Sequence, residues 1–155
     1  MRKKRVYKKY YHQDSTYERI DVGRFINFLM REGKKTIARK AVYGAFDKIK
    51  EETKKEPMEI FELALANASP MIEVFSKRVG GANYQVPREV RPERRFMLGV
   101  RWIINAARAK KGKPIAEKLA AELIAASKNE GDAVKKKQDM HRQAEANRAF
   151  AHFAR

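Results

Sequence analysis

The sequence of 155 residues contains no cysteine, and it has only three histidines and one tryptophan. Without cysteine the chain forms no disulfide and offers no thiolate, which fits a reducing compartment. No apolar run approaches the roughly 18 residues that a membrane span requires. The basic, tyrosine-rich N-terminus lacks the apolar core of a signal peptide, so we expect the protein to stay in a soluble compartment.

Negative charge is also scarce, since 19 acidic residues stand against 36 basic ones and leave a formal net charge of +17. Such a charge opposes compaction by self-repulsion, so we expect a polyanionic partner: a nucleic acid, an anionic membrane or an acidic protein. The sequence lacks metal-ligand spacing and the Gly-x-Ser-x-Gly and Gly-x-Gly-x-x-Gly motifs. We therefore predict a non-enzymatic protein with no catalytic residue, metal, cofactor or small-molecule substrate.

Six segments repeat apolar residues at helical spacing. In the first, Asp21 is expected to be the N-cap and Gly33 to end the helix, and Ser15 with Glu18 upstream suggests a capping box. The other five are expected at about 34–53, from Pro57 to Pro70, from Pro92 to Gly112, from Pro114 to Gly131, and from Asp132 to about Ala149. In this scheme Gly131 terminates the fifth helix and Asp132 caps the sixth.

The stretch between the third and fourth helices has the pattern of a β-hairpin. Residues 72–79 and 82–86 are rich in β-branched and aromatic residues and flank a Gly-Gly pair, which signals a two-residue turn. Pro87 is expected to limit the second strand. A lone ribbon is marginally stable, so it requires packing at its base or a ligand along its length. The predicted residue pairs are Val79 with Ala82, Arg78 with Asn83, and Lys77 with Tyr84.

The predicted fold class is mainly α. A single domain, residues 1–155, has about six helices and a protruding two-stranded antiparallel β-ribbon between helices three and four. The ribbon arm covers residues 72–88, and residues 1–14 are predicted to form a basic, flexible N-terminal arm.

Five groups of basic residues are the predicted RNA contacts, because lysine and arginine neutralise phosphates. Each group also has an ordinary interpretation as a solvated surface. Tyrosines interleave the first group and can stack on unpaired bases. The groups are the arm (Arg2, Lys3, Lys4, Arg5, Lys8 and Lys9), the start of the second helix (Lys34 and Lys35), the ribbon tip (Lys77 and Arg78), the fourth helix (Arg94, Arg95, Arg101 and Arg108) and the last helix (Lys135, Lys136, Lys137 and Arg142).

Local geometry favours phosphate contacts in several of these groups. Lys34 and Lys35 follow Gly33 at a helix start, where N–H groups and charge suit an anion. Arg94, Arg101 and Arg108 are spaced by seven and form one helical stripe. The lysines that open the last helix oppose its dipole, which indicates an anionic partner. A run of glutamates is expected to form an acidic flank facing away from RNA: Glu51, Glu52, Glu56, Glu59 and Glu62.

A β-ribbon fits the major groove of DNA but is excluded from the narrow groove of A-form RNA. On RNA it would lie along backbones, loops or junctions. The alternative function is an architectural DNA-binding protein with a basic β-ribbon arm. Such arms often carry an apolar wedge at the tip, whereas this ribbon carries Gly80-Gly81, which argues mildly against that alternative.

Four long stretches resemble one known family. They are REGKKTIARKAVYGA (31–45), SKRVGGANYQVPREVRPERR (76–95), RWIINAAR (101–108) and GDAVKKKQDMHRQAEANRAFAHF (131–153). With these stretches in order, the chain resembles the bacterial form of the family of the seventh small-subunit ribosomal protein over nearly its whole length.

The resemblance implies a six-helix domain with a ribbon, working in the cytoplasm as a structural part of the ribosome, away from membranes. It implies binding to the head domain of small-subunit rRNA, nucleation of head assembly, and neighbouring small-subunit ribosomal proteins as partners. It also implies a position near the exit-site tRNA and the mRNA. The ribbon tip would lie toward these two: Val79, Gly80, Gly81, Ala82, Asn83 and Tyr84.

Overall fold

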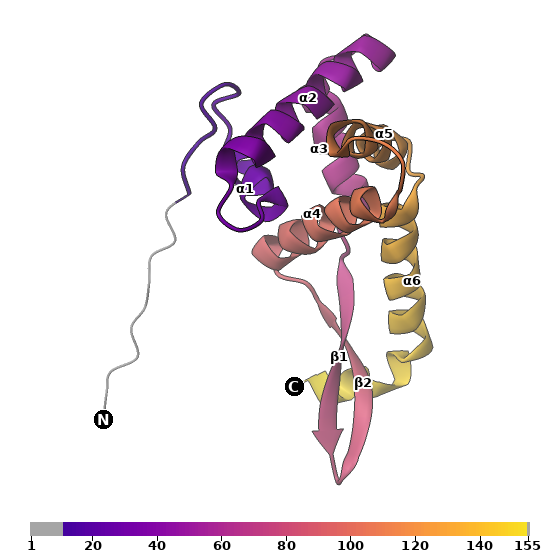
Figure 1. Ribbon diagram of the computed structural model, residues 1–155. Helices are drawn as coiled ribbons and strands as arrows, with labels where there is room; N and C mark the ends of the chain where they lie inside the picture. The colour runs from indigo at the N-terminus through magenta and orange to yellow at the C-terminus, as the bar shows by residue number, and fades with distance from the viewer. Residues whose placement is uncertain (1–10, 155) are drawn as a thin grey trace, which may run out of the picture.

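The computed structural model describes residues 11–154 and confirms the predicted fold class. A helical body carries a two-stranded antiparallel ribbon that projects from it between the third and fourth helices (Figure 1). The elements are α1 (Ile20–Leu29), α2 (Lys35–Thr53), α3 (Pro57–Ala68), β1 (Ile72–Val79), β2 (Ala82–Glu89), α4 (Pro92–Ala109), α5 (Ile115–Ser127), α6 (Asp132–Ala146) and the 3₁₀-helix η1 (Arg148–Ala154).

The core forms where α5 packs against α2, α3 and α4. Leu119 and Leu123 of α5 are fully buried there, as the helical spacing predicts. A second part of the core is aromatic: the ring of Phe61 meets the rings of Phe25 and Phe46 edge to face, with centroids 5.2 and 5.6 Å apart. Edge-to-face pairs add about 0.5–1.5 kcal/mol to the burial of apolar area. This core makes the body rigid enough to carry the ribbon.

The start of α1 differs from the predicted capping pattern. Asp21 lies inside the first turn, and Arg19 occupies the cap position without a capping side chain. The proposed capping box at residues 15 and 18 is also wrong, because the buried carboxylate of Asp14 accepts the backbone N–H groups of Thr16 and Tyr17 and caps that turn instead. Helix α1 then ends at Leu29, before the turn at residue 33.

The junction between α5 and α6 corrects two further predictions. Asn129 takes the left-handed conformation after α5, at φ 64°, whereas Gly131 is the N-cap of α6 and Asp132 is its first residue. The cap comes from another helix: fully buried Glu122 accepts the N–H of Ala133 at 3.0 Å. A Cβ at position 131 would lie 2.9 Å from the Glu122 carboxylate, so this position requires glycine. The last α-helix also stops earlier than predicted, and η1 follows it.

The ribbon has the predicted register, with Val79 opposite Ala82 and each later pair in step. The second strand runs through Pro87 to Glu89, so the expectation that this proline limits the strand is wrong. Hydrogen-bonded pairs alternate with open pairs along an antiparallel ladder. Counted from the turn, Pro87 and Val74 form a non-hydrogen-bonded pair. At such a position a backbone N–H would point away from the partner strand. The missing donor therefore costs no ladder hydrogen bond.

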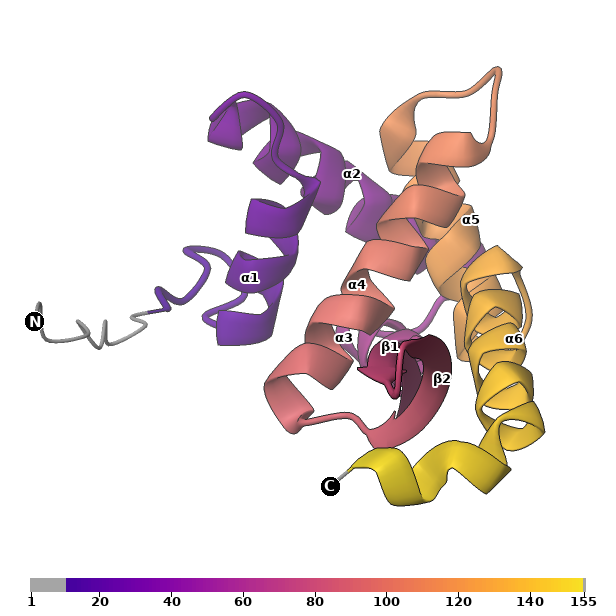
Figure 2. The ribbon, with the colours of Figure 1, turned by 90° about the horizontal axis from the view of Figure 1, so that it is seen from below.

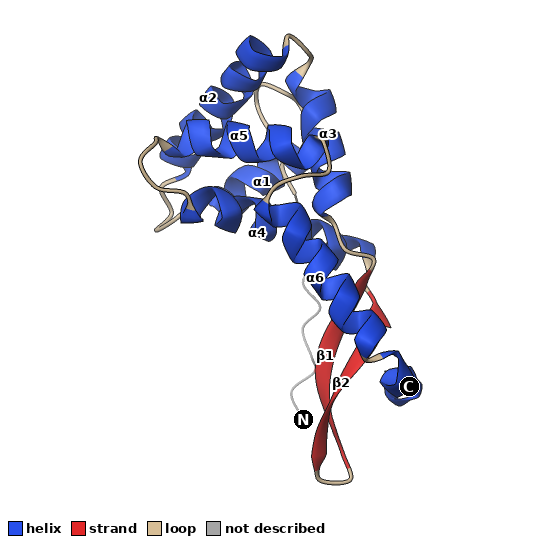
Figure 3. Ribbon diagram, turned by 90° about the vertical axis from the view of Figure 1, so that its right-hand side faces the viewer, coloured by secondary structure: helices blue, strands red, loops and turns tan. Residues whose placement is uncertain are grey.

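The ribbon also has a packing partner along its length. Helix α6 runs beside it, and η1 lies against β2 (Figure 3). Seen from below, η1 extends from α6 past the ribbon (Figure 2). The Tyr84 ring lies 5.2 Å from the Phe150 ring and 5.3 Å from the Phe153 ring, and Lys77 Nζ donates to the Phe153 carbonyl at 2.6 Å. This aromatic cluster supplies the support that a two-stranded ribbon needs.

At its base the ribbon is joined to the body by a buried carboxylate. Glu73 on β1 is only 4% exposed and pairs with Arg88 of β2 at 2.8 Å and with Arg94 of α4 at 2.6 Å. Burial by itself would raise the pKa of Glu73, but the hydrogen bonds and charges of the two arginines outweigh it and hold the pKa below its ordinary value. The carboxylate therefore stays charged and holds three elements together.

Replacing Glu73 with Gln should lower the free energy of unfolding by about 1–3 kcal/mol, because the amide lacks the negative charge and one of the two oxygens that accept from the arginines. A lowered folded pKa makes this contribution complete above the pKa of an unfolded carboxyl group, and it is lost as pH falls through the folded value. The gap between the variant and the wild type in chemical denaturation should therefore shrink below about pH 4. Glu89→Gln, at an exposed carboxylate of the same ribbon, is the matched control and should change stability by less than about 0.5 kcal/mol. Equal effects of the two variants would contradict the role of Glu73.

Candidate nucleic-acid interface

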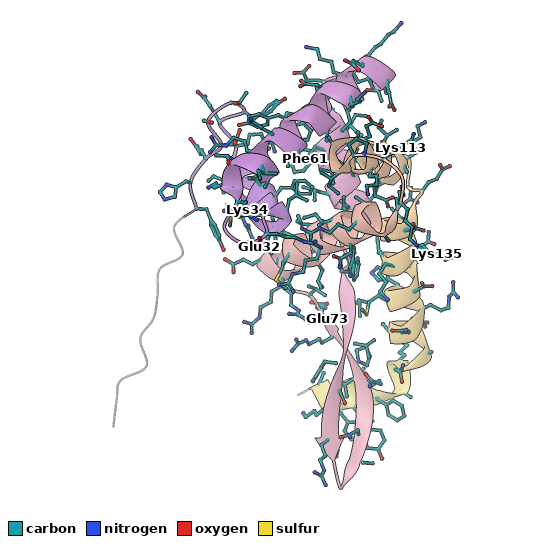
Figure 4. All side chains as sticks on the ribbon, viewed as in Figure 1. Glu32, Lys34, Phe61, Glu73, Lys113 and Lys135 are labelled. Atoms are coloured by element: carbon teal, nitrogen blue, oxygen red, sulfur yellow. The ribbon has the colours of Figure 1, made fainter. Side chains whose placement is uncertain are left out.

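The fold brings two of the predicted contact residues into one pocket. Lys34, in the turn after α1, and Arg108, in the last turn of α4, line a cavity of about 380 Å³ together with Arg31 and Lys118. Figure 4 shows Lys34 at this turn beside Glu32. The floor of the pocket is apolar, with Leu29 and other aliphatic side chains. No carboxylate lines it, so four cations surround one hollow.

Backbone carbonyls, rather than carboxylates, hold two of these cations. Arg108 donates to the carbonyl of Leu29 at 2.8 Å, and Lys118 Nζ donates to the carbonyl of Lys110 at 2.8 Å. Burial lowers the pKa of Arg108, and the positive charge of Arg31 lowers it further. Carbonyls fix these side chains without neutralising their charge. The pocket therefore suits a phosphate, which accepts hydrogen bonds and supplies the missing negative charge.

Lys34 has a carboxylate partner, because its Nζ lies 2.6 Å from Glu32. Both side chains are more than half exposed, so this surface pair contributes little and does not compete strongly with a phosphate. Lys35 is exposed at the start of α2. The predicted contacts omitted Arg31, although it lies in the same turn as Lys34, and Lys118, which only the packing of α5 in the fold brings to the pocket.

The arginines of α4 do not act as one uniform stripe. Arg94 is bound to Glu73, Arg108 is bound inside the pocket, and Arg101 is exposed with its guanidinium 5.8 Å from the Phe28 ring. Arg95 is half-buried near the helix start. Arg101 is thus the member of the stripe most available to a ligand, while Arg94 has a structural role as well.

At the ribbon tip, Arg78 and Asn83 are exposed, whereas Lys77 and Tyr84 are engaged with η1. Both turn glycines have positive φ, which is the conformation that a tight two-residue hairpin requires. Val79 is half-buried, and Gly80, Gly81 and Ala82 are exposed. The tip is therefore narrow, and Arg78 is its exposed arginine.

The basic residues of α6 also divide into two kinds. Lys135 and Lys136 are exposed, and their side chains make no hydrogen bond or ion pair within residues 11–154. Lys137 donates to the carbonyl of Asn67 at 2.8 Å, and burial followed by the nearby Arg95 lowers its pKa. Arg142 is exposed and 3.8 Å from Asp139. Lys135 lies on the other side of the molecule from Lys34 in Figure 4, so these lysines face a different part of any partner.

The charges are unevenly placed along the molecule. The acidic flank is exposed at the end of α2 and on α3, at the end opposite the ribbon tip (Figures 1 and 3). The basic residues of the predicted arm lie outside the described residues: Arg2, Lys3, Lys4, Arg5, Lys8 and Lys9. The basic surfaces of the described part lie at the α1–α2 turn, along α4, at the ribbon and on α6.

Comparison with known proteins decides the family. The family model described as ribosomal protein S7p/S5e matches residues 1–148. The chain belongs to this family. The small ribosomal subunit protein uS7 of Thermotoga maritima is 56% identical over 153 residues, which cover 99% of both chains. The protein of the same name from Caldanaerobacter subterraneus is 56% identical over 140 residues, or 90% of each chain. The resemblance inferred from the four sequence stretches is confirmed.

The S7p/S5e family is one of ribosomal structural proteins and not of enzymes, in agreement with the predicted class. Within residues 11–154, no cluster of three or more histidine or acidic side chains is placed to hold a metal ion. None of the helices described is both long and apolar enough to cross a membrane.

The pocket of four cations makes a prediction about the free protein. Arg31→Gln should raise the free energy of unfolding by about 0.2–0.5 kcal/mol at low ionic strength, because it relieves repulsion with Arg108. The gain should vanish in 1 M salt, where charges are screened within about 3 Å. Thermal melting at both salt concentrations measures it. Lys50→Gln removes the same charge from the acidic end of α2 and should give no gain; a gain as large as that of Arg31→Gln would contradict the prediction.

Proposed function

We propose that this protein binds the head domain of the small-subunit rRNA, nucleates assembly of the head, and holds its ribbon tip toward the exit-site tRNA and the mRNA. Small-subunit membership follows from the family, and a ribosomal component of this bacterial type works in the cytoplasm. The observation that carries the proposal is the pocket of four cations without a carboxylate, in a chain that matches a ribosomal family over residues 1–148.

The arrangement of the cations suits folded RNA better than a regular duplex. Basic residues at the α1–α2 turn and on α6 face different sides, so one straight helix would not reach both. A folded RNA domain with several helices and junctions offers phosphates in more than one direction. Nucleation of assembly is a natural consequence, because a protein that contacts several RNA segments fixes their relative positions.

The ribbon is held in a way that supports its proposed position. Glu73 fixes its base to α4, and the Tyr84 cluster with η1 supports its middle. The tip therefore projects beyond the helical body (Figure 3), and it would remain accessible to a second RNA when the body binds rRNA. Its exposed Arg78 and Asn83 are suited to backbone and base-edge contacts with a second RNA.

The purified protein should bind a head-domain rRNA fragment far more tightly than DNA duplex of equal length at matched salt. If about 6–10 phosphates are neutralised, affinity for the fragment should fall by roughly 10³- to 10⁵-fold between 50 and 200 mM salt. Filter binding or fluorescence anisotropy measures both. Equal affinity for DNA would favour the architectural DNA-binding alternative, and a flat salt response would contradict an electrostatic interface.

A charge-matched pair of variants locates the interface on the protein. Arg31→Gln with Lys34→Gln should weaken binding to the fragment and reduce the salt slope by about two, or about one for each lost phosphate contact. Lys50→Gln with Lys55→Gln removes the same charge from exposed positions beside the acidic flank and should leave the slope nearly unchanged. Equal losses in the two variants would mean that net charge, and not the pocket, determines binding.

The ribbon is tested on assembled subunits. A photoreactive amino acid in place of Asn83 should cross-link to tRNA or mRNA in small subunits loaded with both, since the tip is exposed and projects from the body. The same group in place of Glu52, on the acidic flank, should give no such cross-link. Cross-links from position 83 to head rRNA alone would overturn the proposed position of the tip.

A further inference from the structure

A groove separate from the cation pocket lies between α1 and the start of α4. It consists of two adjoining cavities of about 650 and 180 Å³ that share Tyr11, Arg24 and Phe28. Asn27 lines the smaller cavity, and Arg91 and Met97 line the larger. The lining thus combines aromatic rings, an amide and guanidinium groups.

The position of Arg24 is unusual for a cation. Its guanidinium carbon lies 4.5 Å from the centre of the Tyr11 ring and 4.2 Å from the centre of the Phe96 ring. Its Nε is buried and has no hydrogen-bond partner in the part of the chain that the structure describes. Aromatic rings, and not a carboxylate, therefore hold this charge in place. Glu93 also lines the groove, and it has an interaction of its own.

From these contacts we infer that the groove receives one unpaired nucleobase of the bound rRNA, stacked on Tyr11 and Phe28. The inference rests on the proposed function, because it assigns a structural class of nucleotide to the same rRNA partner. Aromatic side chains recognise single-stranded bases by stacking, and arginine adds cation–π attraction and phosphate contacts. A paired base is already stacked in its helix, so a bulge or loop supplies the occupant.

The remaining polar groups fit the other parts of a nucleotide. Asn27 is exposed at the edge of the smaller cavity, and its amide can donate to and accept from the edge of a base. Arg91 is exposed at the mouth of the larger cavity, where it can bind the phosphate of that nucleotide. Tyr11 is 40% exposed, so part of its ring is accessible to a ligand although Arg24 lies over the ring. A simple anion would leave this aromatic surface unused.

The test combines cross-linking with a conservative pair of variants. Ultraviolet cross-linking of the wild-type protein to the head-domain fragment, followed by mass spectrometry, should attach a nucleotide to the peptide containing Tyr11 or that containing Phe28. Tyr11→Leu should weaken binding roughly 5- to 100-fold, the range for one lost stacking contact. Tyr11→Phe keeps the ring and should bind like the wild type. Thermal melting should show that both variants are folded, since Tyr11 lies outside the core.

Each other result has a distinct meaning. In one outcome the wild type binds the fragment tightly, the cross-links lie only outside the groove, and Tyr11→Leu binds as tightly as the wild type. This outcome would overturn the base-binding groove but leave the proposed rRNA function intact. Failure of the wild type to prefer the fragment over DNA would overturn the proposed function, and the inference with it. In a third outcome free nucleoside monophosphates abolish the groove cross-links at concentrations that leave the fragment bound. That result would assign the groove to a free nucleotide and overturn the rRNA occupant.

Discussion

The direction of the ribbon depends on one buried carboxylate. Glu73 binds Arg88 from the second strand and Arg94 from α4, so it joins both strands to the helical body at a single point. Two strands alone would not hold a fixed direction, because a ribbon has no core of its own. With its base fixed and η1 packed on its middle, the ribbon becomes a rigid extension of the body. The relative placement of the tip and the surfaces proposed to face rRNA follows from this constraint.

The second constraint is charge. A formal net charge of +17 is spread over a body whose core is ordinary, and four of the cations gather at a pocket whose lining includes no carboxylate. Such an arrangement destabilises the free protein slightly and becomes favourable when phosphates fill it. The exposed acidic flank at the end of α2 and on α3 would repel phosphates and so leaves this attraction to the other surfaces. The basic surfaces of the protein are therefore complementary to the negative charge of RNA.

Much of the fold could be predicted because it depends on local patterns: helical spacing indicated the six α-helices, and the Gly-Gly turn predicted the three pairs nearest the tip, although the second strand extends beyond its predicted end. The errors arose where tertiary contacts replaced local ones, as when Glu122 caps α6 from another helix and displaces Asp132 from that role. The candidate site was less predictable. Sequence alone could not separate Lys137, which the fold binds to a carbonyl, from exposed Lys136, and it missed Lys118 because packing alone brings that residue to the pocket.

The most direct test of the account uses the absence of cysteine, since any cysteine introduced is the only thiol in the chain. An iron–EDTA group attached at Lys34→Cys releases hydroxyl radicals that cleave only nearby RNA, and the same group at Glu52→Cys serves as the control. In complexes with the head-domain fragment, position 34 should give strong cleavage at defined sites and position 52 should give little. Equal cleavage from both positions, or cleavage from position 52 alone, would contradict the proposed orientation of the protein on rRNA.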